Sequence, residues 1–281
     1  MRTLRYLIVD VFTDRPLSGN QLAVFTDARG VDDALMQSLA REMNFSETVF
    51  VLPKEKGGTA RIRIFTPTRE LAFAGHPTLG AAFVIGTTVQ LDRIDLETGA
   101  GLVPVALERQ MATVTFGWMS QPLPASHPWT QDAELLSALG LDRAELPIRV
   151  YDNGMRHVLV AVADRAQVAA LAPDLGRLAK LPAECISVFA GDGTDYKTRM
   201  FAPAAGVNED PATGSAAGPI ALHLVHNGRL AFGAELRLEQ GAELARPSVL
   251  HARIVGNIER TERVDVGGAA VIVARGEFRL Q

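Results

Sequence analysis

The stretch LAFAGHPTLGAAFVIGTTVQL, residues 71–91, contains no Asp, Glu, Lys or Arg, and neither does PATGSAAGPIALHLVHNG, residues 211–228. A helix that is apolar on all sides is a buried helix. The short length of both stretches and their Pro and Gly interruptions argue against a membrane span. Each stretch therefore predicts a helix at the centre of one half of the protein, with a sheet wrapped around it.

The two stretches belong to a longer internal repeat. RIFTP at 63–67 reappears as RMFAP at 199–203, and TVF at 48–50 reappears as SVF at 187–189. Closer to the N-terminus of each copy, the segment NQLAVF at 20–25 parallels the segment GMRHVL at 154–159. The order of these features is the same in both copies, at a nearly constant offset. The repeat predicts an ancient tandem duplication with two pseudo-symmetric halves, because two copies are too few for a solenoid.

Each half is expected to be an α+β unit with a mostly antiparallel sheet. In the first half, alternating apolar residues predict strands at 4–12, 21–25, 48–52 and 60–65. Helical spacing between them predicts a helix with Asp33 as N-cap and an end at Asn44. The Pro-rich segment 121–129 is expected to be a linker. Two strands around Gly267–Gly268 are expected to return to the first half. The expected domains are 1–122, completed by 270–281, and 123–269.

The composition narrows the class of protein. The chain has 281 residues, a formal net charge of -4 and one cysteine, Cys185. No internal disulfide can form, and Cys185 is expected to be an inert buried thiol. A nucleic-acid binder would show a basic excess, and the first apolar run is interrupted by Asp10. We therefore expect a cytoplasmic protein that binds neither nucleic acid nor membrane.

The polar starts of the two buried helices are candidate binding sites. Because proline favours the first helical position, His76-Pro77 and Asp210-Pro211 predict N-caps at His76 and Asp210. Capping alone would explain Asp210, whereas His76 is a poor cap and needs another reason. If both helix starts face one cleft between the halves, they form an anion site suited to a substrate carboxylate. Further donors there come from Thr213, Gly214 and Ser215.

Glu47 is the candidate for proton transfer. It precedes the apolar run Val49–Val51, and its counterpart in the second half is the apolar Ile186. A carboxylate at this position is either a solvated turn residue or a partly desolvated group. Partial desolvation is what a general base and acid requires.

Other features are weak signals. His223 and His226 are spaced as metal ligands, but no third ligand is near them in the sequence, so no metal is expected. Gly191-Asp192-Gly193 lacks the third glycine of a dinucleotide fingerprint.

Five blocks of sequence resemble the PhzF-like phenazine-biosynthesis family. They are NFSET at 44–48, FTP at 65–67, ELAFAGHPT at 70–78, NGMRH at 153–157 and EDPATGSA at 209–216. The later QG at 240–241 and RPS at 246–248 fit as well, so the similarity runs nearly from end to end. One departure is Ala72, where the family commonly has proline.

The resemblance implies the diaminopimelate-epimerase fold and an isomerase that needs no cofactor. The phenazine member of the family acts on trans-2,3-dihydro-3-hydroxyanthranilate, in which it shifts a proton across the ring to give a ketone. By analogy, Glu47 removes and returns the proton, while His76 and Asp210 bind or polarise the substrate. Ser215, with backbone contacts at Gly75 and Gly214, completes the implied site. The resemblance also implies a homodimer. The cysteine pair of the epimerases is absent, so a two-thiol racemisation is not expected.

Three functions remain open from the sequence. The first is an isomerase of the phenazine type. The second is an epimerase or another isomerase on a different small amino or hydroxy carboxylate, for which Asp210 or His76 would have to supply a second acid. The third is a binding protein without catalysis, which the complete set Glu47, His76, Asp210 and Ser215 argues against.

Overall fold

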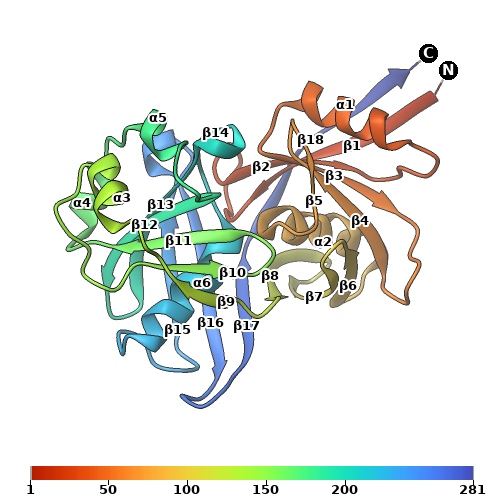
Figure 1. Cartoon of the computed structure of the whole chain (residues 1–281). Helices are drawn as coiled ribbons and strands as arrows, with labels where there is room; N and C mark the ends of the chain where they lie inside the picture. Colours follow the sequence, from red (N-terminus) through yellow and green to blue (C-terminus); the bar gives the residue numbers. More distant parts are fainter. Residues whose placement is uncertain (1, 281) are drawn as a thin grey trace. The chain divides into compact units, whose positions relative to one another are not determined.

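The computed structural model describes residues 2–280, and the chain divides into two compact units. The first unit comprises Met1–Ser120 and Gly267–Gln281, and the second comprises Gln121–Val266. Figure 1 labels their helices and strands. Within the described residues, no helix combines the length and the apolar character that a membrane span requires.

The elements up to Ser120 alternate strands with two helices. They are β1 (Arg2–Val11), β2 (Asn20–Phe25), α1 (Asp33–Met43), β3 (Glu47–Leu52), β4 (Ala60–Phe65), β5 (Glu70–Leu71), α2 (Gly75–Val89), β6 (Arg93–Thr98), β7 (Gly101–Gln110) and β8 (Thr113–Gln121).

The elements after Gln121 repeat this order with extra short helices. They are β9 (Ala125–Pro128), α3 (Asp132–Leu139), β10 (Arg149–Asp152), β11 (Arg156–Ala161), α4 (Arg165–Ala169), α5 (Leu175–Leu178), β12 (Cys185–Asp192), β13 (Asp195–Ala202), η1 (Pro203–Ala205), β14 (Val207–Asp210), α6 (Gly214–His226), β15 (Glu235–Gln240), η2 (Ala242–Leu244), β16 (Ser248–Gly256), β17 (Thr261–Gly268) and β18 (Ala270–Leu280).

Strand pairing shows the duplication directly. In the first unit β18 pairs with β1, and the order continues through β2, β3, β4, β6 and β7. In the second unit the order is β9, β10, β11, β12, β13, β15 and β16. The pairs β2–β3 and β4–β6 are parallel, and so are their counterparts β11–β12 and β13–β15. All the other pairs named here are antiparallel, which confirms the expected α+β fold with mostly antiparallel sheets.

A buried helix lies against the sheet of each unit, as the charge-free stretches predict. In α2, every residue from Gly75 to Gly86 is buried, and in α6 every residue from Gly214 to Val225 is buried. Close packing depends on small residues. A Cβ added to Gly80 would lie 2.6 Å from Cδ2 of Leu22 and 2.8 Å from Cγ2 of Val11, so only glycine lets α2 approach β1 and β2 this closely.

The opposite face of each sheet packs against the remaining helices. Because side chains alternate between the faces of a strand, Leu22 meets α2 while Phe25 and Phe50 join Met36 of α1 in a separate cluster. In the second unit, Val158 and Val188 pack with Leu135 of α3 in the same way. Each sheet therefore has apolar cover on both faces, which holds its strands in one register.

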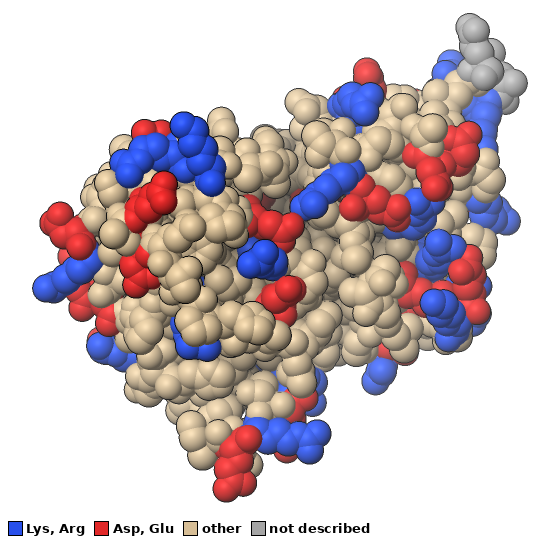
Figure 2. Space-filling view, viewed as in Figure 1, with Lys and Arg blue, Asp and Glu red and all other residues tan. Residues whose placement is uncertain are grey.

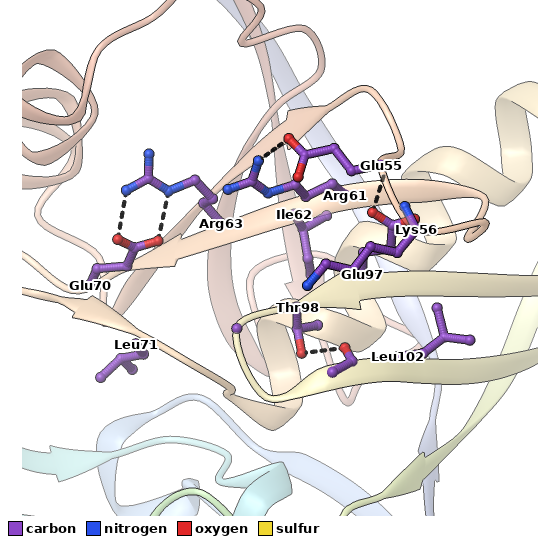
Figure 3. Close-up of a pocket in the computed structure, with 12 residues that line it drawn as sticks. Glu55, Lys56, Arg61, Ile62, Arg63, Glu70, Leu71, Glu97, Thr98 and Leu102 are labelled. Atoms are coloured by element: carbon purple, nitrogen blue, oxygen red, sulfur yellow. Dashed lines mark hydrogen bonds and ion pairs between the residues drawn. The ribbon is translucent and has the colours of Figure 1, made fainter.

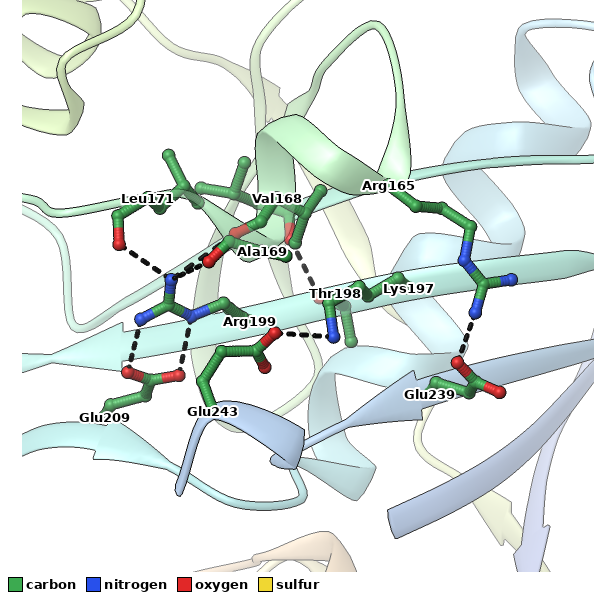
Figure 4. A network of polar contacts seen from close by, with 11 residues as sticks. Arg165, Val168, Ala169, Leu171, Lys197, Thr198, Arg199, Glu209, Glu239 and Glu243 are labelled. Carbon is green, nitrogen blue, oxygen red and sulfur yellow. Dashed lines mark hydrogen bonds and ion pairs between the residues drawn. The ribbon is translucent and has the colours of Figure 1, made fainter. Parts of the chain in front are cut away.

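An Arg–Glu ion pair recurs at the same place in both copies. Arg63 on β4 donates to both oxygens of Glu70, and Arg199 on β13 donates to both oxygens of Glu209. Each guanidinium also lies 5.1 Å from the ring of the phenylalanine two residues later. In the second unit, Nη1 of Arg199 reaches three backbone carbonyls, those of Val168, Ala169 and Leu171 (Figure 4).

Most other charges lie at the surface, where both signs are mixed. On the face drawn in Figure 2, Lys and Arg side chains alternate with Asp and Glu side chains. Several form exposed ion pairs, such as Arg29 with Asp27 and Arg279 with Glu277.

Two expectations about the helix starts were wrong. The N-cap of α2 is Ala74, so His76 and Pro77 are the second and third helical residues. The N-cap of α6 is Thr213, and Asp210 is the last residue of β14. A proline is tolerated throughout the first helical turn, because the N–H groups there have no partner within the helix. The position of Pro77 therefore does not predict which residue is the first of α2.

Smaller expectations also need correction. The N-cap of α1 is Asp32, one residue before Asp33, whereas the end at Asn44 is confirmed. The expected linker 121–129 contains a strand, β9, which pairs with β10. Pro128 is tolerated there because it is the last residue of β9, which pairs with β10. Proline is accepted at sheet edges, where its missing N–H leaves no strand unpaired.

The repeated ion pair allows a prediction with an internal control. The Arg199 and Glu209 side chains are 8% and 13% exposed, whereas Glu70 is 41% exposed. Glu209→Gln leaves a buried guanidinium without its counter-charge and should lower the free energy of unfolding by roughly 3 kcal/mol. Glu70→Gln should cost about 1 kcal/mol or less, because the pair is more exposed and Asp33 still contacts Arg63. Urea unfolding of both variants measures the difference, and equal losses would contradict it.

Candidate active site

Glu47 and His76 come together in the first unit. Glu47 is the first residue of β3, and His76 is the second residue of α2. Oε2 of Glu47 lies 3.5 Å from Nε2 of His76, and the side chains are 13% and 4% exposed. Glu47 is therefore largely desolvated, as a proton-transfer residue requires, and is not a solvated turn carboxylate.

His76 is a neutral imidazole at physiological pH. Burial penalises the charged ring and lowers the pKa of His76 to about 3, although the backbone of Gln21 acts in the opposite direction. A neutral imidazole has one N–H donor and one acceptor nitrogen. His76 can therefore donate a hydrogen bond without placing a positive charge beside Glu47.

Asn20 lies on the other side of the His76 ring. It is the first residue of β2, is 1% exposed, and its Nδ2 is 3.3 Å from Nδ1 of His76. The sequence repeat singled out the segment that begins at Asn20, but Asn20 was not predicted as a site residue. Its contact with His76 depends on how β2 packs against α2, which the sequence does not specify.

Asp210 is held in a polar cluster of the second unit. Its Oδ2 accepts a hydrogen bond of 2.6 Å from Oγ1 of Thr213. Gln240 donates to the Asp210 carbonyl and to Oγ1 of Thr213, and its Oε1 accepts from the Thr213 N–H. Both predicted donors of Thr213 are thus used inside the protein. Gln240 was missed as a site residue, although it lies in one of the blocks that resemble the family.

The first turn of α6 carries Gly214 and Ser215, both buried. The carbonyls of these two residues accept hydrogen bonds from Gln121 and Asn153, at 2.8 and 2.9 Å. Oγ of Ser215 lies 3.9 Å from Sδ of Met155. Since a thioether sulfur is a weak acceptor, the Ser215 hydroxyl can bind a stronger partner.

His223 and Cys185, which the sequence did not assign to the site, are both buried. Nδ1 of His223 lies 3.2 Å from the Tyr151 hydroxyl, and burial lowers the pKa of His223 to about 4. Residues 2–280 contain no group of three or more His, Cys, Asp or Glu side chains that could hold a metal ion. Cys185 is a buried free thiol at the start of β12.

A separate cavity in the first unit has paired charges. It has a volume of about 240 Å³ and is lined by β4, β5 and the hairpin of β6 and β7 (Figure 3). Arg61 pairs with Glu55, and Arg63 pairs with Glu70. The Glu97 carboxylate accepts from the backbone N–H groups of residues 55, 56 and 58. Because these charges are satisfied within the protein, this cavity is a poorer candidate site than the Glu47–His76 pair.

Comparison with known proteins identifies the family. The model of the PhzC-PhzF family, described as phenazine biosynthesis-like protein, matches residues 9–276. The chain belongs to this family. It is 47% identical to the trans-2,3-dihydro-3-hydroxyanthranilate isomerase of Pseudomonas aeruginosa, covering 98% of this chain and 99% of that protein. The isomerase of the same name from Pseudomonas fluorescens is 46% identical, with the same coverage.

Solved structures of the PhzC-PhzF family share the fold. A PhzF family protein of Bacillus anthracis matches with a TM-score of 0.88, 26% identity and full coverage of both chains. A predicted epimerase from Pseudomonas aeruginosa matches with a TM-score of 0.86 and 34% identity, over 99% of this chain and all of that one. A hydroxyproline epimerase from Agrobacterium vitis matches with a TM-score of 0.65 at 12% identity. The match covers 98% of this chain and 92% of the epimerase chain. That distant likeness supports the expected epimerase-type fold alone.

The burial of His76 predicts a pH dependence of stability. The pKa of His76 falls from 6.5 to about 3 on folding, so the unfolded chain binds one more proton between these two values. The contribution of His76 to the free energy of unfolding is therefore fully present above pH 6.5 and is lost progressively as the pH falls toward 3. At pH 5 the loss due to His76 should be roughly 2 kcal/mol relative to pH 7. Urea unfolding of wild type and His76→Gln at both pH values measures it. An equal loss in both proteins would contradict the neutral buried ring.

Proposed function

We propose that this protein is a trans-2,3-dihydro-3-hydroxyanthranilate isomerase with Glu47 as its general base and acid. The observation that carries the proposal is the largely buried Glu47 carboxylate 3.5 Å from a neutral His76. The names of its relatives in two Pseudomonas species support the choice of substrate.

The proposed reaction only relocates protons within the substrate and needs no redox partner. Removal of the proton from the ring carbon that bears the hydroxyl leaves an electron pair that is delocalised over the neighbouring double bonds. Return of the proton to another ring carbon, followed by transfer of the hydroxyl proton, gives the ketone with the same atoms and electrons. One carboxylate can serve both carbons, because it accepts the proton in the first step and delivers it in the second.

The other site residues would bind and polarise the substrate. Nε2 of His76 can donate to an oxygen that gains charge during the proton shift. Asp210 would accept hydrogen bonds from substrate donors, and Ser215 and Gly214 would offer a hydroxyl and backbone N–H groups at the start of α6. Gly75 would do the same at the start of α2. Because its donors are already used, we propose that Thr213 holds Asp210 in place and does not contact the substrate.

Glu47→Gln tests the role of the carboxylate. The amide keeps the shape of the side chain and cannot accept the proton, so kcat should fall by on the order of 10²–10⁴-fold or more. Glu42→Gln makes the same change on the exposed face of α1 and should leave kcat unchanged. Both rates follow from substrate consumption by purified protein. A Glu47→Gln variant with the wild-type rate would remove Glu47 from the mechanism.

The second candidate function gives a different result with the same protein. If wild type does not consume this substrate but interconverts the enantiomers of another small carboxylate, chiral chromatography will detect the product. That result would favour an epimerase.

We also propose that the enzyme works without a cofactor, as a homodimer in the cytoplasm, on a small carboxylate and without nucleic-acid or membrane partners. A homodimer predicts a mass close to twice the chain mass of 30.2 kDa by light scattering after size exclusion. A mass of one chain would contradict it.

A further inference from the structure

An asparagine contacts the second residue of the central helix in both units. In the first unit Nδ2 of Asn20 lies 3.3 Å from Nδ1 of His76, and in the second unit Nδ2 of Asn153 donates to the carbonyl of Ser215 at 2.9 Å. Both asparagines are buried, at 1% and 2% exposure. They also occupy similar places: Asn20 opens β2, and Asn153 lies in the turn before β11, the counterpart of β2. The repeated amide contacts backbone in one unit and a titratable ring in the other.

The chemistry of the Asn20 contact determines where His76 carries its proton. An amide nitrogen has two donor hydrogens and accepts none. With the amide nitrogen directed at the ring, as here, Asn20 donates the hydrogen bond and Nδ1 of His76 accepts it. Since the buried ring is neutral and has a single N–H, the proton lies on Nε2. That nitrogen is the one 3.5 Å from the carboxylate of Glu47.

We propose that Asn20 is a positioning residue that fixes His76 in the Nε2–H form and so presents an N–H donor beside Glu47. The effect on turnover rests on the proposed isomerase function, whereas the position of the proton does not.

The structure explains why this position of the proton matters. Nε2 of His76 is buried and makes no hydrogen bond to any group of residues 2–280, so its N–H can be donated to a substrate oxygen. With the proton on Nδ1 instead, a lone pair would face the Glu47 carboxylate and no donor would face the substrate. A donor aimed at a developing oxyanion is typically worth about 10²–10³-fold in kcat.

The backbone of Gln21 supports a rival arrangement. It is the group that favours a charged His76 ring, as a carbonyl that accepts an N–H would. If Nδ1–H donated to that carbonyl, the Asn20 amide would have to present its oxygen or lose its contact with the ring. The two arrangements place the proton on different nitrogens, so one measurement distinguishes them.

Nitrogen-15 NMR of the wild-type protein, with ring nitrogens labelled and His76→Gln used for assignment, reads the proton position directly. We expect a protonated Nε2 and an unprotonated Nδ1 in His76 at pH 7, without any ligand. A protonated Nδ1 would overturn the proposal. This measurement needs no turnover, so it tests the position of the proton even if the protein proves inactive on the proposed substrate.

Variants at Asn20 test the consequence for turnover. In Asn20→Asp, a carboxylate accepts a proton from Nδ1, so the proton should move to Nδ1 and kcat should fall roughly 10²-fold with little change in KM. In Asn20→Ala the ring loses its donor, and the NMR signals should show a mixture of both forms with a smaller loss of kcat. If the buried aspartate prevents folding, the Asn20→Ala variant and the wild-type spectrum still test whether Asn20 fixes the proton on Nε2.

Asn257→Asp is the matched control. Asn257 lies in the exposed turn between β16 and β17, and its Oδ1 accepts two backbone N–H bonds that an aspartate can also accept. This variant should keep the wild-type kcat and His76 spectrum. Asn20 variants that keep the wild-type proton position and kcat would overturn the proposal. An inactive wild type with the expected spectrum would instead contradict the isomerase function alone.

Discussion

The burial of most of a charge-free helix in each unit is the constraint on which the site depends. Because α2 is enclosed by the sheet from Gly75 to Gly86, its second residue, His76, loses contact with water. Desolvation then keeps the ring neutral, and a neutral ring can lie 3.5 Å from Glu47 without forming a charged pair. The packing that stabilises the fold therefore also sets the chemistry of the proposed proton-transfer residue.

The two copies of the fold share their framework and differ at the residues of the proposed site. Strand pairing, the central helix, the Arg–Glu pair and the buried asparagine are present in both units. At the start of the central helix, however, the first unit has His76 and the second has Ser215. At the start of the strand, Glu47 corresponds to Ile186. The shared features maintain each sheet, and the differences place the proposed base in one unit and the proposed polar binding groups in the other.

Much of this could be predicted from the sequence because burial and repetition leave direct marks on it. The absence of charge identified α2 and α6, and the offset between copies identified the duplication. Local ends were harder to predict: His76-Pro77 was interpreted as a cap and first residue, although a proline fits any position of the first turn. Asn153 and Gln240 lie in blocks that resemble the family, but their roles and that of Asn20 arise from contacts between residues 27 to 62 positions apart, which the sequence does not show.

The central claim is that Glu47 moves a proton within the ring of the substrate, and proton NMR in deuterated water tests it most directly. Wild-type protein is added to trans-2,3-dihydro-3-hydroxyanthranilate, and the signal of the C–H beside the hydroxyl is followed with time. The account predicts that this signal disappears while the ketone forms, without any added cofactor, and that it persists when Glu47→Gln replaces the wild-type protein. Unchanged signals, or an inverted stereocentre with the hydroxyl still in place, would contradict it.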